Sequence, residues 1–226
     1  MEWNAFFEIK KPYQITDKTK TIEFTDVVVF RPNDSMELLT NHRLMRDWHD
    51  YFCENFSFTP SCKSYIDGEF DKYLKGKEEY TIGVICRGTD YQLLRPAGHP
   101  IQPSPEDLFD IIDSLLERAC YKYVYLTTED IEIYQSFKRK YKEILISLPQ
   151  KRVALKEKKY LADVVKENGI DTYDRNLQYL TAVVLLSKCR ALVGGRTSGT
   201  VAAIVMSEGF SDMYLWNDGR YGEEID

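Results

Sequence analysis

Two loop segments combine the residue types that bind anions. In Arg87-Gly88-Thr89-Asp90, the arginine offers a planar fork that matches a phosphate or a carboxylate, and the glycine lets the backbone come close to it. The segment 194–200 joins glycines, hydroxyl groups and Arg196 at an expected helix start, where backbone N–H groups also attract anions. Together the two segments predict a site that holds a diphosphate from two sides. The alternative for Arg87 is a surface pair with Asp90, which stabilises a protein little.

A third segment, Thr127-Thr128-Glu129-Asp130, comes at another expected helix start. Threonine caps helices and acidic residues complement the helix dipole, so capping alone explains these residues, although the Thr128 hydroxyl can also meet a ligand. His99 lies in a loop with four prolines and is a candidate proton acceptor, because its unperturbed pKa is about 6.5. A histidine that only packs or caps is the alternative. Asp90 is the other candidate, although a carboxylate beside a guanidinium is held ionised and is weakly basic.

Strand and helix patterns alternate from residue 79 onward. Short apolar runs rich in β-branched residues predict strands at 80–86, 121–126, 144–148 and 190–193, with an edge strand at 214–216. Capping residues and apolar stripes predict helices at 104–116, 128–141, 174–188 and 198–207. This alternation predicts an α/β fold with a Rossmann-like, doubly wound parallel sheet over residues 79–226. Such sheets bind ligands at the carboxyl ends of their strands, where the three segments lie.

The first 78 residues are more polar and irregular. One strand is expected at 26–30, and helices are expected from Leu38 to Trp48 and around 65–74. The basic run 151–159 is interpreted as a solvated loop, with a ligand-binding patch as the alternative.

Composition excludes several classes of protein. The 226 residues include 30 basic and 36 acidic ones, so the net charge is −6, which argues against a nucleic-acid or polybasic membrane surface. No apolar run approaches the ~18 residues of a membrane span, and the N-terminal residues do not resemble a secretion signal. Five cysteines without a C-x-x-C motif indicate reduced thiols in the cytoplasm, and three histidines argue against a metal site.

Several motifs recur in the order found in one known superfamily. They are the blocks 82–90, 99–101 and 124–130, and the block 186–189 leading into Thr197-Ser198. In this order they resemble the donor-binding half of the fucosyltransferase superfamily, which includes α-1,6-fucosyltransferases, nodulation fucosyltransferases and protein O-fucosyltransferases. The stretch 2–222 is similar to bacterial relatives associated with surface polysaccharides. The resemblance implies a GT-B fold, GDP-fucose as donor, a glycan or polysaccharide acceptor, and no metal.

The resemblance also implies roles for individual residues. Arg87 would hold the donor diphosphate, and Thr197 and Ser198 would contact phosphate. The predicted catalytic residues are Arg87, together with Asp90 and His99 from the loops that follow the same strand. The predicted donor-binding residues are Arg87, Gly88, Thr128, Arg196, Thr197, Ser198, Gly199 and Thr200.

The sequence departs from the superfamily at three positions. Ile85 stands where the first motif usually has a histidine. Ala182 lies near the position at which the superfamily has an aspartate that helps to read guanine. Arg95 stands where the α-1,6 enzymes have a glutamate, their candidate base. These departures concern the guanine specificity and the base that activates the acceptor.

A GT-B enzyme has two Rossmann domains of ~100–150 residues each. We therefore expect residues 1–78 to be the truncated remnant of the N-terminal, acceptor-side domain and residues 79–226 to be the nucleotide-sugar-binding domain. Two functions remain open: metal-independent fucosyl transfer, or a degenerate module that binds a nucleotide or glycan without catalysis. A Rossmann-type oxidoreductase is disfavoured because the first strand is not followed by a glycine fingerprint.

Overall fold

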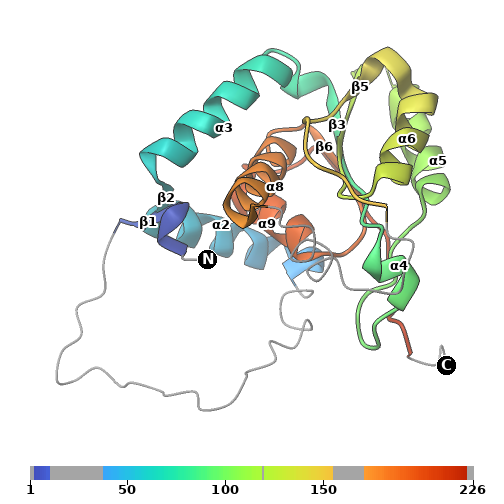
Figure 1. Cartoon of the computed structure of the whole chain (residues 1–226), viewed down its shortest axis with the longest axis horizontal. Coiled ribbons are helices and arrows are strands. Elements are labelled where there is room, and N and C mark those ends of the chain that lie inside the picture. The colour runs from blue at the N-terminus through green and yellow to red at the C-terminus, as the bar shows by residue number, and fades with distance from the viewer. Residues whose placement is uncertain (1–2, 11–37, 119, 155–170, 223–226) are drawn as a thin grey trace.

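A five-stranded parallel sheet forms the centre of the molecule (Figure 1). The computed structural model describes residues 3–10, 38–118, 120–154 and 171–222. The strands are β3 (Thr81–Ile85), β4 (Tyr123–Thr127), β5 (Leu145–Ile146), β6 (Ala191–Gly194) and β7 (Asp212–Leu215). Their order is β5-β4-β3-β6-β7, and every neighbouring pair is parallel. The predicted α/β fold with a Rossmann-like parallel sheet is confirmed, and the strand predicted at 26–30 lies outside the described residues.

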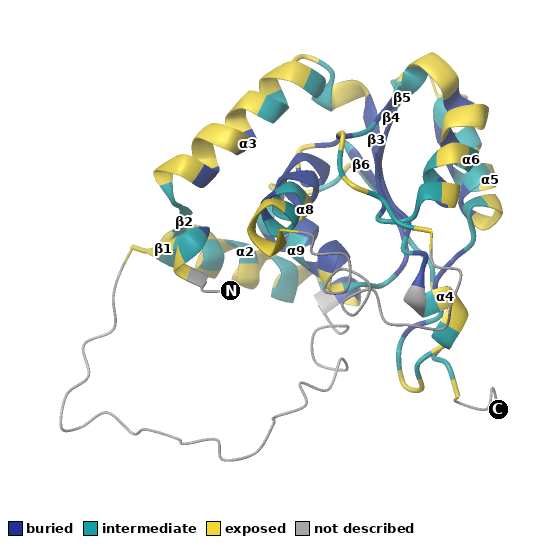
Figure 2. Cartoon of the chain, viewed as in Figure 1, coloured by how far each residue is buried: buried dark blue, intermediate teal, exposed yellow. Residues whose placement is uncertain are grey.

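Helices cover both faces of this sheet because the strand side chains alternate between the faces. Ile82 and Val84 point to the face covered by α5 (Pro105–Leu116) and α6 (Ile131–Tyr141). Ile85 points to the other face, which is covered by α8 (Thr172–Leu186) and α9 (Ser198–Met206). Figure 2 shows the buried residues concentrated along the strands and on the inner sides of these helices. The strands are buried on both faces, as their apolar runs predict.

The N-terminal elements pack onto the α8 and α9 side of the sheet (Figure 1). They are η1 (Trp3–Ala5), β1 (Phe7–Ile9), η2 (Leu38–Thr40), α2 (His42–Asn55), β2 (Phe56–Phe58) and α3 (Pro60–Tyr73), and β1 and β2 pair antiparallel. Phe6, Cys62, Ile66 and Leu74 belong to the same hydrophobic core as α8 and α9. The described N-terminal residues therefore share a core with the sheet, and the division of the chain at residue 78 stays a prediction.

Capping residues set the helix starts. Ser104 caps α5 in a reciprocal capping box with Asp107, as predicted. α6 begins at Ile131 and not at 128, because the Asp130 carboxylate accepts the N–H groups of Glu132 and Ile133. The remaining short elements are η3 (Glu78–Tyr80), α4 (Asp90–Leu94) and η4 (Lys142–Ile144).

The strand order reverses its direction next to β3. The chain passes from β3 to β4 and β5 on one side, and then returns to place β6 and β7 on the other side. The carboxyl ends of β3 and β6 therefore border the crevice in which doubly wound sheets bind ligands. The predicted anion-binding loops follow these two strands.

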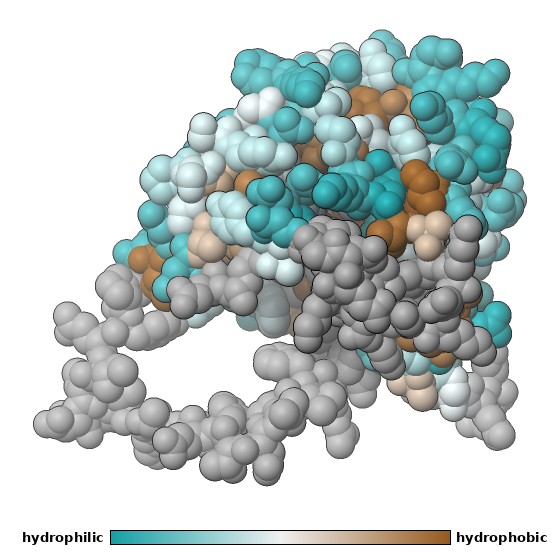
Figure 3. Space-filling model, in the orientation of Figure 1, coloured by the Kyte–Doolittle hydropathy of each residue, from teal (hydrophilic) through white to brown (hydrophobic). Residues whose placement is uncertain are grey.

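The described residues that form the surface in the view of Figure 3 are mainly hydrophilic, with scattered apolar ones. None of the helices among the described residues has the length and apolar character needed to cross a membrane. All five cysteines are free thiols, and Cys62, Cys86 and Cys189 are buried.

Gly83 and Gly68 offer a matched test of this packing. A Cβ added to Gly83 in β3 would lie 2.7 Å from Cδ1 of Leu186 and 3.0 Å from Cβ of Cys189, whereas a Cβ on Gly68 in α3 would meet nothing within 4 Å. We expect Gly83→Ala to lower the free energy of unfolding by about 1–3 kcal/mol through overpacking. Gly68→Ala should raise it by roughly 0.5–1 kcal/mol, because alanine loses less entropy in a helix. Urea denaturation measures both, and equal stabilities would contradict the close approach of α8 to β3.

Candidate functional site

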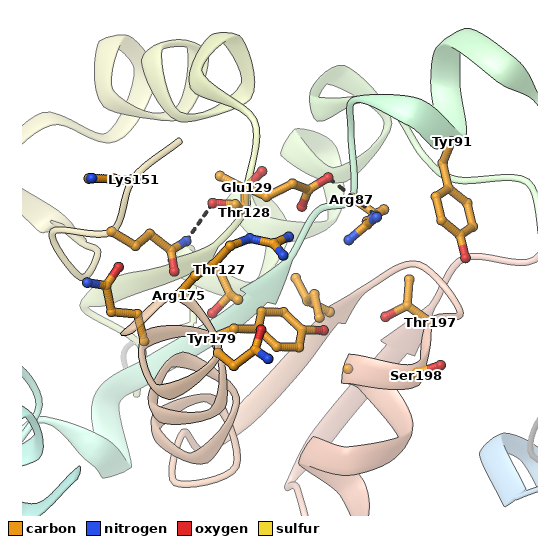
Figure 4. Close-up of a pocket in the computed structure, with 15 residues that line it drawn as sticks. Arg87, Tyr91, Thr127, Thr128, Glu129, Lys151, Arg175, Tyr179, Thr197 and Ser198 are labelled. Carbon is orange, nitrogen blue, oxygen red and sulfur yellow. Dashed lines mark hydrogen bonds and ion pairs between the residues drawn. The ribbon is translucent and has the colours of Figure 1, made fainter. Parts of the chain in front are cut away.

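A cavity of about 210 Å³ lies at the carboxyl ends of β3, β4 and β6 (Figure 4). We call it the strand-end cavity. Its walls come from the ends of β3 and β4, the start of α9, the residues after β5, and the first turns of α8. This is the crevice that the strand order predicts, so the fold and the cavity indicate the same ligand site.

Arg87 enters this cavity from the loop after β3 (Figure 4). Its Nε lies 3.4 Å from Oε1 of Glu129, and its guanidinium carbon lies 4.9 Å from the centre of the Tyr91 ring. The side chains of Arg87 and Glu129 are only 23% and 18% exposed, so their attraction is screened less than that of a surface pair. Arg87 is thus held at the cavity by a carboxylate and an aromatic face.

Glu129 and Asp130 join the loop after β3 to the end of β4. Oε1 of Glu129 accepts the backbone N–H of Gly88 and the hydroxyl of Thr89, both at 3.0 Å. Oδ2 of Asp130 accepts the N–H of Thr89 at 3.0 Å. Thr89 has φ 49° and ψ −120°, a region that costs a non-glycine residue about 1–3 kcal/mol. These hydrogen bonds hold the strained backbone that places Arg87.

The start of α9 supplies backbone donors on another wall. Thr197 caps the helix, because its hydroxyl oxygen accepts the N–H of Thr200 at 3.1 Å. Ser198 and Gly199 line the cavity, and their N–H groups have no intrahelical partner at this position of a helix. The positive end of the helix dipole also lies here and favours a bound anion.

Five predicted donor-binding residues line the strand-end cavity: Arg87, Thr128, Thr197, Ser198 and Gly199. The structure brings them together from three strand ends, although their roles stay predictions. Asp90 begins α4, and its side chain is not among those described.

Three other predicted donor-binding residues lie outside the cavity lining. Thr200 is fully buried and donates its hydroxyl to the carbonyl of Gly195 at 2.6 Å. Gly88 lies against Asp130, since a Cβ on it would come within 2.6 Å of Oδ2 of Asp130. Arg196 contacts Gln102 through its carbonyl, and burial together with Arg220 lowers the pKa of its guanidinium. For these three residues a role in ligand binding stays a prediction.

His99 also lies outside the cavity lining. Its Nδ1 is 3.2 Å from the hydroxyl of Tyr91, and the two rings meet edge to face. Tyr91 itself lines the cavity, so His99 reaches the site only through that phenol. This arrangement favours the packing alternative over direct proton abstraction.

Sequence reasoning missed part of the cavity. Lys151, Arg175 and Tyr179 line it, together with Gln150 and Gln178. Lys151 is exposed and lines the cavity, so for this residue both the solvated-loop interpretation and the ligand-patch alternative stay open, and 155–159 lie outside the described residues. The spacing of Arg175 and Tyr179 on one helical face was the available signal, but the apolar pattern of α8 indicates only a packed helix.

The charges that line the cavity are mainly positive. Arg87, Lys151 and Arg175 stand against one carboxylate among the described lining residues, that of Glu129. The chain as a whole has a net charge of −6, so the positive cavity departs from the average surface. No group of side chains suited to a metal ion is present among the described residues. Because its lining charges are mainly positive, the cavity fits an anionic ligand held by arginine, lysine and N–H groups.

Comparisons with solved structures find fucosyltransferases. The chain is similar to the fucosyltransferase NodZ from Bradyrhizobium with a TM-score of 0.45 and 14% identity, covering 81% of this chain and 51% of that one. It is similar to a NodZ α-1,6-fucosyltransferase co-crystallised with GDP (TM-score 0.44, 14% identity, 73% and 46% covered). POFUT1 in complex with GDP-fucose gives a TM-score of 0.43 at 10% identity, with 78% and 50% covered.

The chain thus spans about half the length of the solved structures it matches. These structures belong to the superfamily that the sequence motifs resemble. No protein-family model matches the chain, and no curated protein matches its sequence.

Glu129→Ala tests whether this carboxylate holds the loop after β3. We expect the Gly88 amide to exchange its hydrogen about tenfold faster or more, because it loses a charged acceptor. The Thr89 amide keeps its bond to Asp130 and should be affected less. Hydrogen exchange measured by NMR reports both amides, and Glu132→Ala, on the exposed side of α6, serves as the control. Unchanged exchange at Gly88 would contradict the role of Glu129.

Proposed function

We propose that the chain is a glycosyltransferase-like protein that binds a nucleoside diphosphate sugar in the strand-end cavity. The reaction would transfer fucose from GDP-fucose to a glycan acceptor without a metal ion. The observation that supports this most is the convergence of Arg87 and the start of α9 on one cavity at the point where the strand order reverses. The resemblance of the motifs to fucosyltransferases supports the choice of donor.

A diphosphate suits the chemistry of this cavity. Arg87 can donate two parallel hydrogen bonds to phosphate oxygens, and the N–H groups of Ser198 and Gly199 can donate to a second set of oxygens. The volume of about 210 Å³ is below the roughly 300–1,000 Å³ of closed ligand pockets, so a nucleotide sugar would be enclosed only in part. We place the diphosphate in the enclosed part, because that is where the cations and the helix start lie.

The transfer step makes a specific demand on these groups. The bond between the anomeric carbon and the diphosphate oxygen breaks, an acceptor hydroxyl oxygen bonds to that carbon, and the hydroxyl proton goes to a base. Negative charge develops on the departing diphosphate, where fixed cations and N–H donors stabilise it most. Arg87 and the start of α9 would supply this stabilisation without a metal ion.

A second candidate is a module that binds the nucleotide or a glycan without catalysis. Glu129 is the one carboxylate among the described residues that line the cavity, and it is already paired with Arg87. Its Oε1 also accepts hydrogen bonds from the N–H of Gly88 and the hydroxyl of Thr89, so this carboxylate already holds the loop after β3. This observation favours binding without proton abstraction, unless the acceptor itself or a residue outside the cavity takes the proton.

Three further expectations belong to the same proposal. The acceptor would be a polysaccharide or other glycan, the protein would act in the cytoplasm, and residues 1–78 would be the remnant of an acceptor-side domain. The position of α2 and α3 against α8 and α9 is compatible with such a remnant. Assays of transfer to glycan acceptors test the first of these expectations.

Calorimetry tests the proposal directly. GDP, UDP, CDP and their sugars are titrated into the chain in the absence of metal. The proposal expects at least one nucleoside diphosphate to bind, with GDP and GDP-fucose preferred. If none binds at millimolar concentration, the proposal is wrong. Release of fucose or its transfer above background would exclude the second candidate.

Arg87→Ala should weaken nucleoside diphosphate binding by ~1.5–3 kcal/mol, the usual contribution of a hydrogen bond to a charged group. This corresponds to a dissociation constant about 10- to 150-fold higher in the same calorimetric titration. Arg139→Ala, on the exposed side of α6, is the control and should bind as the parent does. A folded Arg87→Ala variant with parental affinity would show that Arg87 is a surface residue.

His99→Gln separates a base from a packing residue. Since His99 reaches the cavity only through Tyr91, we expect nucleotide binding to change less than threefold, about 0.7 kcal/mol. Any transferase activity should also fall by far less than the ~10²–10⁴-fold that a general base contributes. A loss of that size with intact binding would restore His99 as the catalytic base.

A further inference from the structure

α8 directs two polar side chains into the strand-end cavity. Arg175 and Tyr179 lie four residues apart, so they share one face of the helix. Figure 4 shows both near the middle of the cavity, which Arg87 enters from the loop after β3. Arg175 and Tyr179 thus form a wall of their own, separate from the loops that the sequence motifs mark.

The charge of Arg175 is not matched within the described part of the chain. Arg87 has Glu129 at 3.4 Å, whereas no carboxylate of the described residues lies within 4.0 Å of the half-buried Arg175. Arg152, another half-buried arginine, instead donates to the hydroxyl of Ser147 at 2.6 Å and to the carbonyl of Leu148 at 3.0 Å. Arg175 therefore keeps its hydrogen-bonding capacity for a partner that enters the cavity.

Tyr179 places its hydroxyl at the start of α9. A Cβ on Gly199 would lie 2.4 Å from this hydroxyl oxygen, so a side chain at this position would force the phenol to shift. The residue is 43% exposed, and the exposed part lines the cavity. Burial of the hydroxyl raises the pKa of Tyr179, although the guanidinium groups of Arg87 and Arg175 act in the opposite direction. The phenol is therefore protonated at neutral pH and can donate.

We infer that Arg175 and Tyr179 bind the diphosphate from the side opposite Arg87, and so complete the anion site together with the start of α9. The inference deepens the proposed function and rests on it for the nucleotide part of the ligand. The pair adds one charge-assisted donor and one hydroxyl donor to the site. Because Glu129 already neutralises Arg87, Arg175 and Lys151 provide the positive charge that a diphosphate needs in the cavity.

The first experiment uses two probes, inorganic pyrophosphate and GDP, in calorimetric titrations. Arg175→Gln and Tyr179→Phe should each weaken the binding of both probes about tenfold, because each removes a hydrogen bond to a charged group. Arg139→Gln, which removes a positive charge from the exposed side of α6, should leave both affinities unchanged. The Phe variant keeps the ring and its packing, so it tests the hydroxyl even if the Arg175 variant is unstable.

The second experiment tests the geometry through Gly199. Gly199→Ala should weaken pyrophosphate binding in the parent, because the new methyl group displaces the Tyr179 hydroxyl. In the Tyr179→Phe background the ring carbon Cζ would lie 3.5 Å from the added Cβ, an ordinary contact. The approach of 2.9 Å to Cδ1 of Ile85 remains in both backgrounds, so the same substitution should cost less, but not nothing, in the Phe variant. Non-additive losses in this double-mutant cycle are expected. Fully additive losses would overturn the placement of Tyr179 at the anion site.

The outcomes distinguish this inference from the proposed function. Pyrophosphate binding that depends on Arg175 and Tyr179 supports the inference even if no nucleoside diphosphate binds, in which case the proposed function alone fails. Conversely, GDP binding that depends on Arg87 but is unchanged in Arg175→Gln and Tyr179→Phe supports the proposed function and overturns the inference. Absence of binding by both probes overturns both.

Discussion

The carboxylate of Glu129 is the contact on which the geometry of the candidate site depends. It pairs with Arg87 and accepts hydrogen bonds from Gly88 and Thr89, so it ties the loop after β3 to the end of β4. Asp130 adds a bond to the strained Thr89 backbone and caps α6 at the same time. Two adjacent acids thereby fix a loop, start a helix and place a guanidinium, which is how a rigid sheet positions functional residues carried by loops.

The sheet makes this arrangement possible because all its strands end at the same edge. Ile85 and Gly194 lie opposite each other in neighbouring parallel strands, so the loops that follow them begin side by side. The close approach extends to Gly199, where Ile85 and Tyr179 occupy the space that a side chain would need. The start of α9 therefore lies open to the cavity, while Thr200 behind it is buried and fixes the turn through Gly195.

The sequence predicts the sheet and its helices well because their signals are local. Apolar β-branched runs mark the strands, and Ser104 marks the start of α5 through its own capping box. The start of α6 was misplaced because several successive residues near 128–130 can cap, and only the structure shows that Asp130 does so. The contact between Glu129 and Gly88 joins residues 41 apart, which no local pattern can reveal. Arg175 on α8 likewise becomes a site residue only when the tertiary fold brings its helix to the strand ends.

The central claim is that the strand-end cavity binds the diphosphate of a nucleotide. A crystal structure of the chain with GDP tests it most directly, because it locates the phosphates and not only their affinity. The account predicts that the diphosphate lies between the Arg87 guanidinium and the N–H groups of Ser198 and Gly199, within hydrogen-bond distance of both. GDP bound elsewhere on the chain, or bound in the cavity with its phosphates turned away from Arg87, would contradict it.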